Sequence, residues 1–159
     1  MTLVVDEVIQ PDGNEGSFAT IALRHGVAIL PIDDDGFVYI TNQFRYALQK
    51  ESIEVVSCGI EGNQPVIEAG KKDLKEEAGI LADDWKYLDK IEQDTSIVKC
   101  PVHLYVVKGL QFQEPEQEGT EDFKIFKKPL QKADEMILKG EITHAPSGVL
   151  ILKANAINH

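Results

Sequence analysis

The stretch Lys72-Asp73-Leu74-Lys75-Glu76-Glu77-Ala78-Gly79-Ile80 decides more about this chain than any other part of its sequence. It closes a segment with clear helix signals at both ends. Pro65 suits the first turn of a helix, where its missing N–H costs nothing, and Gly79 suits the left-handed residue that ends one. We therefore predict a helix over residues 65–78 that stops at Gly79.

Three carboxylates of this helix share one side. Asp73, Glu76 and Glu77 stand at positions i, i+3 and i+4, which at ~100° per residue span about a third of the circumference. Such crowded carboxylates repel each other, and a hard divalent cation would neutralise them. Mg²⁺ accepts a few carboxylates and completes its shell with water and substrate phosphates. The pattern indicates a magnesium site, with Mn²⁺ as a substitute. A solvated face, on which Lys72 and Glu76 form an ordinary i,i+4 pair, is the alternative interpretation.

Composition narrows the classes of function. The chain has 159 residues, of which 43% are hydrophobic, and this suits one domain over residues 1–159 with a normal core. Its net charge of −11 argues against nucleic acid as a partner, because binding to a negatively charged phosphate backbone depends on Lys and Arg, and acidic residues outnumber these here. Cys58 and Cys100 are too few for a disulfide framework. No apolar run reaches ~18 residues and the N-terminus lacks a basic region, so we expect no membrane partner and a cytoplasmic location.

Strand patterns dominate the rest of the sequence. Residues 17–32 favour two strands, or one bent strand, with a break at His25-Gly26. Further strands are predicted over residues 37–44, 52–57, 85–92, 102–109 and 123–126, and further helices over 129–139 and 146–156. Strands around one central helix, with helices near the C-terminus, predict a mixed α/β layered domain.

The central helix lies in a pattern that resembles the Nudix box. That box reads Gly, five residues, Glu, seven residues, then Arg-Glu-aliphatic-any-Glu-Glu-any-Gly-aliphatic. Gly59, Gln64 and residues 72–80 follow it, the seven-residue spacing before Lys72 is kept, and the last five residues fit fully. Gln64, Lys72 and Asp73 replace the first Glu, the Arg and the second Glu, and the loop from Gly59 to Gln64 is one residue short.

Other segments resemble the ADP-ribose pyrophosphatases in the same order along the chain. They are residues 11–13, 26–31, 42–46, 54–59, 103–106, 121–125 and 140–150. The resemblance implies a Nudix-type α/β/α sandwich with a mixed β-sheet. It also implies metal-dependent hydrolysis of ADP-ribose, or a related nucleoside diphosphate sugar, to two monophosphates. A homodimer in which the N-terminal strands, within residues 1–24, cross to the partner is implied as well.

The resemblance assigns candidate roles to individual residues. The expected metal ligands are Asp73, Glu77 and Glu76, with a backbone carbonyl at Gly59 or Cys58 completing the shell. The expected catalytic residues are Glu121, which would position or deprotonate water, Glu118 as its substitute, and Glu76. The expected substrate-binding residues are Arg45, Gln43 and Glu54. A structural role for Arg45 at a strand end, and a rim position for Glu54, remain open alternatives.

The altered box leaves two outcomes for activity. Lysine cannot reproduce the planar, two-pronged contact of arginine, and Gln64 carries no charge. Asp73 is one methylene shorter than glutamate, and a misplacement of ~1 Å can cost about 100-fold in rate. One outcome is a hydrolase whose site has relaxed around these changes. The other is a catalytically impaired domain that binds a nucleotide or serves as an interaction module.

Overall fold

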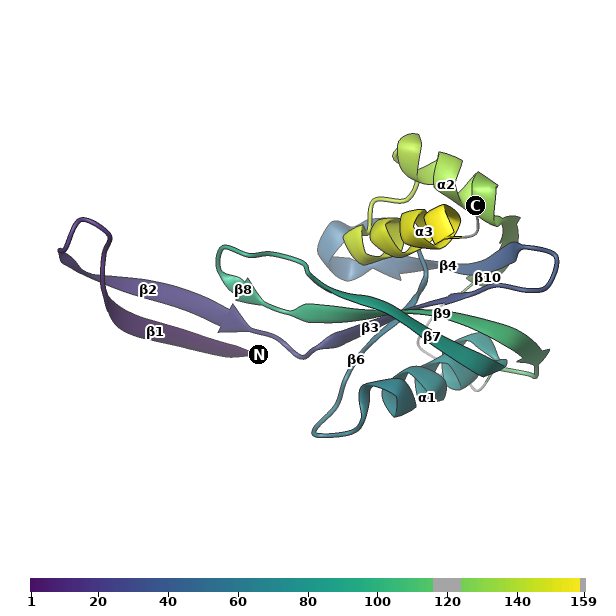
Figure 1. The fold of residues 1–159 in the computed structure, drawn as a ribbon, viewed down its shortest axis with the longest axis horizontal. Coiled ribbons are helices and arrows are strands. Elements are labelled where there is room, and N and C mark those ends of the chain that lie inside the picture. Colours follow the sequence, from purple (N-terminus) through teal and green to yellow (C-terminus); the bar gives the residue numbers. More distant parts are fainter. Residues whose placement is uncertain (116–123, 158–159) are drawn as a thin grey trace.

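The computed structural model describes residues 1–115 and 124–157 (Figure 1). The strands are β1 (Thr2–Ile9), β2 (Glu15–Ala22), β3 (Gly26–Pro31), β4 (Phe37–Arg45), β5 (Lys50–Glu54), β6 (Val56–Gly59), β7 (Ile80–Glu92), β8 (Val98–Lys99), β9 (Pro101–Phe112) and β10 (Lys124–Pro129). The helices are α1 (Val66–Ala78), α2 (Leu130–Leu138) and α3 (Ala145–Ile157), and a 3₁₀ turn, η1, covers Tyr46–Leu48.

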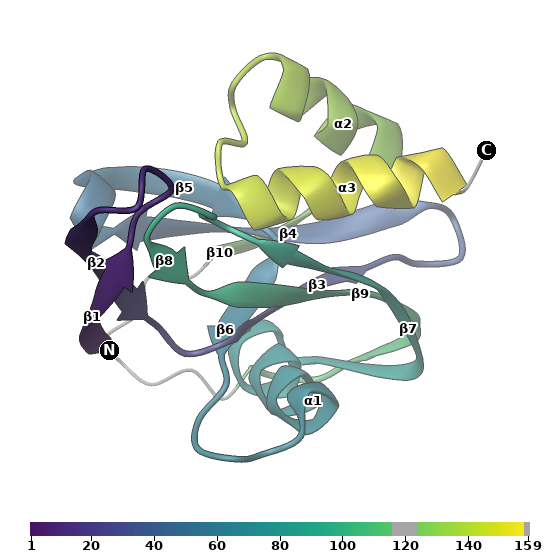
Figure 2. The ribbon, with the colours of Figure 1, turned by 60° about the vertical axis from the view of Figure 1, so that its left-hand side comes forward.

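The centre of the molecule is a four-stranded mixed sheet in the order β6-β3-β9-β7. β3 runs parallel to β9 and antiparallel to β6, and β9 runs antiparallel to β7. A second sheet has the order β10-β4-β5. Helix α1 covers one side of this assembly, and α2 and α3 cover the other (Figures 1 and 2). The predicted α/β/α sandwich with a mixed sheet is therefore confirmed.

The hydrophobic core has two halves, separated by the central sheet. On β3, Val27 and Ile29 pack into the cluster that contains Leu74 of α1. Their neighbours Ala28 and Leu30 pack into the cluster on the α2 and α3 side. Successive side chains of a strand point to opposite faces, so a strand between two helical layers must be apolar at every position. This explains the unbroken apolar run of β3.

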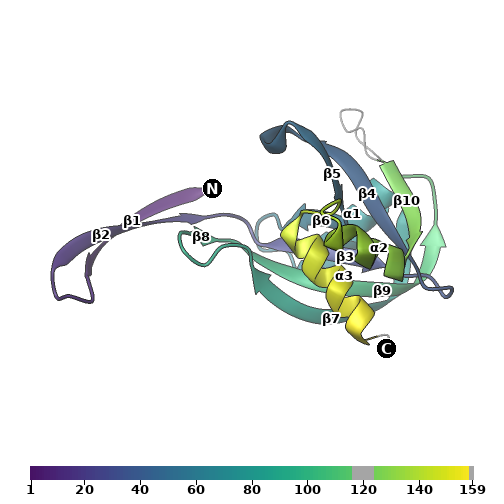
Figure 3. The same ribbon diagram turned by 90° about the horizontal axis from the view of Figure 1, so that it is seen from above.

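An N-terminal hairpin extends away from the body of the molecule (Figures 1 and 3). β1 and β2 pair antiparallel across a turn in which the Gly13 N–H donates to the Gln10 carbonyl at 2.8 Å. One face of β1 carries Leu3, Val5, Glu7 and Ile9, of which Leu3, Val5 and Ile9 are 65%, 62% and 69% exposed. The hairpin thus presents a mostly apolar row, interrupted by Glu7, that the described residues of this chain leave uncovered.

Most predicted elements are present; the short strand β8 was not predicted, and two predicted strands differ in their extent. The predicted strand over residues 52–57 is two strands, because the chain passes from one sheet to the other at Val55. The Val55 N–H donates to Ser147 Oγ at 2.9 Å rather than to a neighbouring strand. The strand predicted from Trp85 already begins at Ile80, which pairs with Phe112.

No helix in the described part of the chain combines the length and apolar character needed to cross a membrane.

Candidate functional site

Helix α1 is fixed at both ends and along one face. Pro65 stands just before its first turn, and Gly79 ends it at φ 60°, with its N–H directed to the carbonyls of Leu74 and Lys75. The helix lies close to the sheet at Gly70, where an added Cβ would come within 3.2–3.3 Å of side-chain atoms of β3 and Trp85. This confirms the predicted helix, and it fixes which side of α1 faces outward.

Asp73 and Glu77, one turn apart, both lie near the thiol of Cys58 on β6. Burial is the largest cause that raises the pKa of this thiol, and hydrogen bonding to Asp73 and the charges of Asp73 and Glu77 raise it further. Both carboxylate side chains are half-buried. The structure therefore brings these two predicted ligands to one edge, where α1 meets the end of β6.

The third carboxylate, Glu76, contacts a lysine of its own helix. Its Oε2 lies 3.8 Å from Lys72 Nζ, and the two side chains are 40% and 60% exposed. This is the i,i+4 contact that the alternative interpretation of the helix anticipated. Within residues 1–115 and 124–157, no group of three or more His, Cys, Asp or Glu side chains is arranged to hold a metal ion.

The donor set at this edge nevertheless fits Mg²⁺. Magnesium takes one or two carboxylates, keeps several waters and shares substrate phosphates, so it needs no cage made only of protein. Asp73 and Glu77 supply two carboxylates. Gly59 ends β6 opposite Gly26 and is exposed, which leaves its backbone accessible at the same edge.

A second polar group lies between β4 and β5. Arg45 Nε donates to Glu54 Oε1 at 2.9 Å, and Nη2 donates to Oε2 at 2.5 Å. Glu54 is only 2% exposed, whereas the Arg45 side chain is 38% exposed. Burial alone would raise the pKa of Glu54, but hydrogen bonds from Arg45 and Ser52 and the charges of His144 and Arg45 hold that pKa below its usual value.

His144 and Ser147 connect this group to the start of α3. His144 Nδ1 lies 3.6 Å from Glu54 Oε2 and 2.7 Å from Ser147 Oγ. Burial lowers the pKa of His144, the charge of Glu54 raises it, and that of Arg45 lowers it again, with a net decrease. A cavity of about 130 Å³ is lined by His144, Cys58 and Gly59, among other residues. This cavity is therefore shared by His144, which contacts Glu54, and by Cys58, which contacts Asp73.

Comparison with known proteins finds two relatives that match nearly the whole chain. An ADP-ribose pyrophosphatase of Mycobacterium tuberculosis (strain ATCC 25618 / H37Rv) is 27% identical over 155 residues, which cover 94% of this chain and 74% of that protein. An ADP-ribose pyrophosphatase of Bacillus subtilis (strain 168) is 25% identical over 157 residues, covering 94% and 82%. The chain is thus similar over almost its whole length to ADP-ribose pyrophosphatases.

The fold of this chain is also found in a solved structure. The crystal structure of an ADP compounds hydrolase matches 98% of this chain and 92% of that chain with a TM-score of 0.82 and 18% identity. At that identity the likeness concerns the fold. No family model matches the chain.

The structure clarifies the spacing of the Nudix box. The loop is one residue short only if Gly59 is taken as the box glycine. Counted from Cys58, the five residues before Gln64 are complete. Cys58 then stands where the box has glycine, and Asp73 where it has glutamate. Because these two side chains lie together, the thiol occupies space beside the shortened carboxylate.

The remaining predicted site residues are Gln43, Glu118 and Glu121. Gln43 is half-buried on β4, opposite Ser52. Glu118 and Glu121 lie outside the described residues. Near Gln64, Arg24 Nη1 forms an ion pair with Glu61 Oε1 at 2.9 Å, and both side chains are well exposed.

Sequence reasoning missed His144 and Ser147 as members of the site. Only their i,i+3 spacing could have suggested that they act together. Nothing local connects them to Glu54, because 92 residues separate Ser147 from its backbone partner Val55.

Proposed function

We propose that this Nudix hydrolase cleaves ADP-ribose, or a related nucleoside diphosphate sugar, to two monophosphates in a reaction that depends on Mg²⁺ or Mn²⁺. The observation that carries the proposal is the placement of Asp73 and Glu77 together at the end of β6. The names of the relatives from M. tuberculosis and B. subtilis support the choice of substrate.

The proposed roles at the α1 edge follow from the donors present. Asp73 and Glu77 would hold the metal, and the carbonyl of Gly59 could add a third oxygen. When bound, the metal would neutralise charge on the phosphate oxygens and favour attack by water. The water oxygen forms a bond to one phosphorus, the bond from that phosphorus to the bridging oxygen breaks, and a carboxylate accepts the water proton. Glu121 is the candidate acceptor by resemblance.

Arg45 is the proposed contact for the distal phosphate or sugar. Its two-pronged contact with Glu54 fixes the plane of the guanidinium, while the side chain stays partly exposed. A fixed guanidinium recognises phosphate oxygens with little loss of side-chain entropy. In this proposal Glu54 orients Arg45, and Gln43 on the same strand adds a polar contact.

A second copy of the chain is the proposed protein partner. The third strand beside this hairpin, β8, pairs with only two residues of β2, so most of the hairpin has two strands, and exposed apolar surface marks protein contacts. Leu3, Val5 and Ile9 provide such a surface on one face of β1, with Glu7 between Val5 and Ile9. Light scattering at micromolar concentration should give a dimer that Val5→Asp dissociates. A monomeric wild-type protein would exclude this partner.

The activity is tested with a substrate panel. ADP-ribose, nucleotide sugars and dinucleotides are incubated with protein and Mg²⁺ or Mn²⁺, and phosphate is measured after coupling to a phosphatase. The matched control is the double variant Asp73→Asn/Glu77→Gln. No release above that control would reject the enzyme. Restoring Gln64→Glu, Lys72→Arg and Asp73→Glu would then show whether the altered box caused the loss.

A catalytically impaired nucleotide-binding domain is the second candidate. It is favoured by the side chain of Glu76, which pairs with Lys72 instead of joining Asp73 and Glu77. A protein that binds nucleotide but no metal should gain thermal stability from ADP-ribose and none from Mg²⁺, since only ligands of the folded state raise the melting temperature.

A further inference from the structure

The first turn of α3 contacts Glu54 at two places. The Val55 N–H, which belongs to the peptide that follows Glu54, donates to Ser147 Oγ at 2.9 Å. His144 Nδ1 lies 3.6 Å from Glu54 Oε2. His144 directly precedes α3, and its carbonyl accepts from the Gly148 N–H at 3.0 Å, so His144 and Ser147 belong to one turn. This turn therefore contacts both the main chain and the side chain of Glu54.

The two residues of this turn also bind each other. His144 Nδ1 and Ser147 Oγ are 2.7 Å apart. A proton on Nδ1 suits both neighbours of that nitrogen, because it can be donated to Ser147 Oγ and also lies beside the Glu54 carboxylate. Burial is the main cause that keeps the pKa of His144 below 6.5, so the ring is neutral at pH 7. His144 thus adds an N–H to the surroundings of a buried carboxylate.

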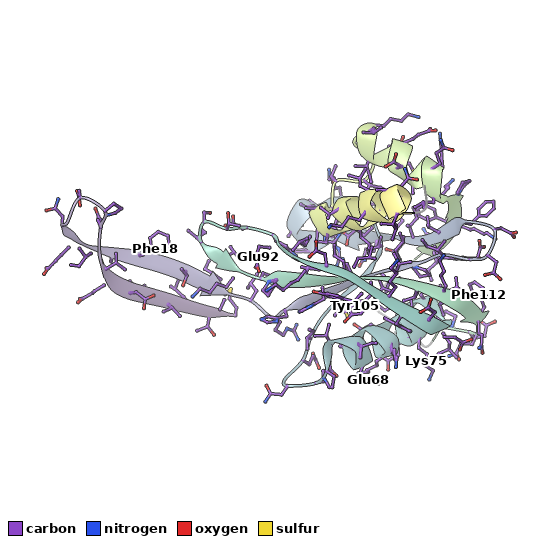
Figure 4. The ribbon with its side chains drawn as sticks, viewed as in Figure 1. Phe18, Glu68, Lys75, Glu92, Tyr105 and Phe112 are labelled. Carbon is purple, nitrogen blue, oxygen red and sulfur yellow. The ribbon has the colours of Figure 1, made fainter. Side chains whose placement is uncertain are left out.

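Helix α3 is a firm support for its first turn. Leu150 and Ile151, one turn further along, are fully buried in the core cluster that also contains residues of β3 and β9. In Figure 4, α3 crosses the sheet on the side opposite α1, the helix that carries the labelled Glu68 and Lys75. Because protein interiors are close-packed, a helix buried in this way leaves its first turn little freedom to move.

Glu54 connects this turn to Arg45. The oxygen that lies near His144, Glu54 Oε2, is also the oxygen to which Arg45 Nη2 donates, and Oε1 accepts from Arg45 Nε. A guanidinium held by two parallel hydrogen bonds follows the plane of the carboxylate. A rotation of the buried Glu54 side chain would therefore turn the partly exposed guanidinium of Arg45 as well.

The contact at Val55 also determines where β6 begins. Val55 is the single residue between β5 and β6, and β6 ends at Gly59, beside the proposed metal edge. Along the chain, Ser147 therefore holds the point between Glu54, which binds Arg45, and the short strand that leads to this edge. His144 lines the same small cavity as Cys58 and Gly59.

We propose that His144 and Ser147 are positioning residues for substrate binding, which hold Glu54 and thereby direct the guanidinium of Arg45 toward the distal phosphate or sugar. The inference rests on the proposed function, in which Arg45 contacts that part of the substrate. Neither His144 nor Ser147 touches the substrate itself. Their effect should therefore appear in the affinity for substrate, and it should require the two-pronged contact between Arg45 and Glu54.

Calorimetric titration with ADP-ribose in the presence of EDTA tests the proposal without metal or turnover. Relative to wild-type protein, His144→Ala and Ser147→Ala should each weaken binding about tenfold, the loss expected when one hydrogen bond to a charged group is misaligned. His144→Asn keeps an N–H near the position of Nδ1 and should restore most of the affinity. Ser96→Ala is the control, because Ser96 is exposed and its hydroxyl contacts Asp94 in the loop after β7.

A double variant separates positioning from a purely structural role. Arg45→Lys keeps the positive charge beside Glu54 but cannot make the two-pronged contact, so it should also weaken binding. Adding His144→Ala to Arg45→Lys should cause no further loss, because residues that act through one contact are not additive. A purely structural role would lower the melting temperature and leave the affinity of the folded protein unchanged. If Ser147→Ala does not fold, the three His144 and Arg45 variants still decide the question.

The proposal is rejected if wild-type protein does not bind ADP-ribose, or if His144→Ala or Arg45→Lys binds it as tightly as wild-type protein. It is also rejected if His144→Asn binds as weakly as His144→Ala, or if the losses of the double variant add. Hydrolysis is measured separately, with Mg²⁺ in the phosphatase-coupled assay, and would stand in each of these cases. Conversely, non-additive losses of affinity support the positioning role even if no hydrolysis is found.

Discussion

Arg45 and Glu54 form a two-pronged ion pair across β4 and β5, at 2.9 and 2.5 Å, in which the carboxylate is buried and the guanidinium is partly exposed. The two partners should therefore respond differently to substitution. Arg45→Met leaves a buried carboxylate without its main partner, and we expect a loss of about 3 kcal/mol in the free energy of unfolding. Glu54→Gln should cost less, because Arg45 can turn toward solvent. Urea denaturation measures both, and equal losses would contradict this difference.

Acid should destabilise the protein in two stages, through His144 and then Glu54. The folded-state pKa of His144 lies below the unfolded value of 6.5, so the unfolded chain binds the proton first and stability falls as pH drops through 6.5. The folded-state pKa of Glu54 lies below 4.5, so the Glu54 carboxylate makes its full contribution to the free energy of unfolding above pH 4.5. That contribution is lost as the pH falls through the folded-state pKa. His144→Gln should flatten the dependence between about pH 7 and 5. Thermal unfolding across this range is the measurement, and an unchanged slope would exclude His144 as its cause.

Glu77 and Glu76 should differ in their effect on metal-dependent hydrolysis. Glu77 lies with Asp73 near Cys58, whereas Glu76 lies beside Lys72. Glu77→Gln should lower kcat about 100-fold or more and abolish the thermal shift produced by Mg²⁺. Glu76→Gln should retain that thermal shift. Titration of each variant with Mg²⁺ is the check, and loss of the shift in both would place Glu76 among the ligands.

Both thiols should react slowly in the folded protein. Burial raises the pKa of Cys58, as do Asp73 and Glu77, and burial together with the charge of Glu92 raises that of Cys100. The thiolate is the reactive form, so alkylation by iodoacetamide at pH 8 should be much slower than in urea. Mass spectrometry of tryptic peptides resolves the two sites. Rapid native alkylation of Cys58 would show that its thiol is not held beside Asp73.

Local signals were sufficient to predict α1 and most strands. Pro65 and Gly79 determine the ends of α1, and the apolar run of β3 determines its burial. The division of β5 from β6 at Val55 could not be predicted, because it depends on Ser147, 92 residues away. Spacing placed Asp73, Glu76 and Glu77 on one side of the helix, but it could not predict that Asp73 and Glu77 lie near Cys58 of β6 while Glu76 contacts Lys72. The contact of Cys58 with Asp73 likewise depends on the packing of β6 against α1.

The most direct test of the central claim is product analysis of ADP-ribose incubated with Mg²⁺ in ¹⁸O-labelled water. We predict AMP and ribose 5-phosphate in equal amounts, with a single ¹⁸O in one of the two phosphates, and no product without the metal. The Asp73→Asn/Glu77→Gln variant should be inactive. Absence of both products in the wild-type protein, or equal amounts from the double variant, would contradict hydrolysis at this site.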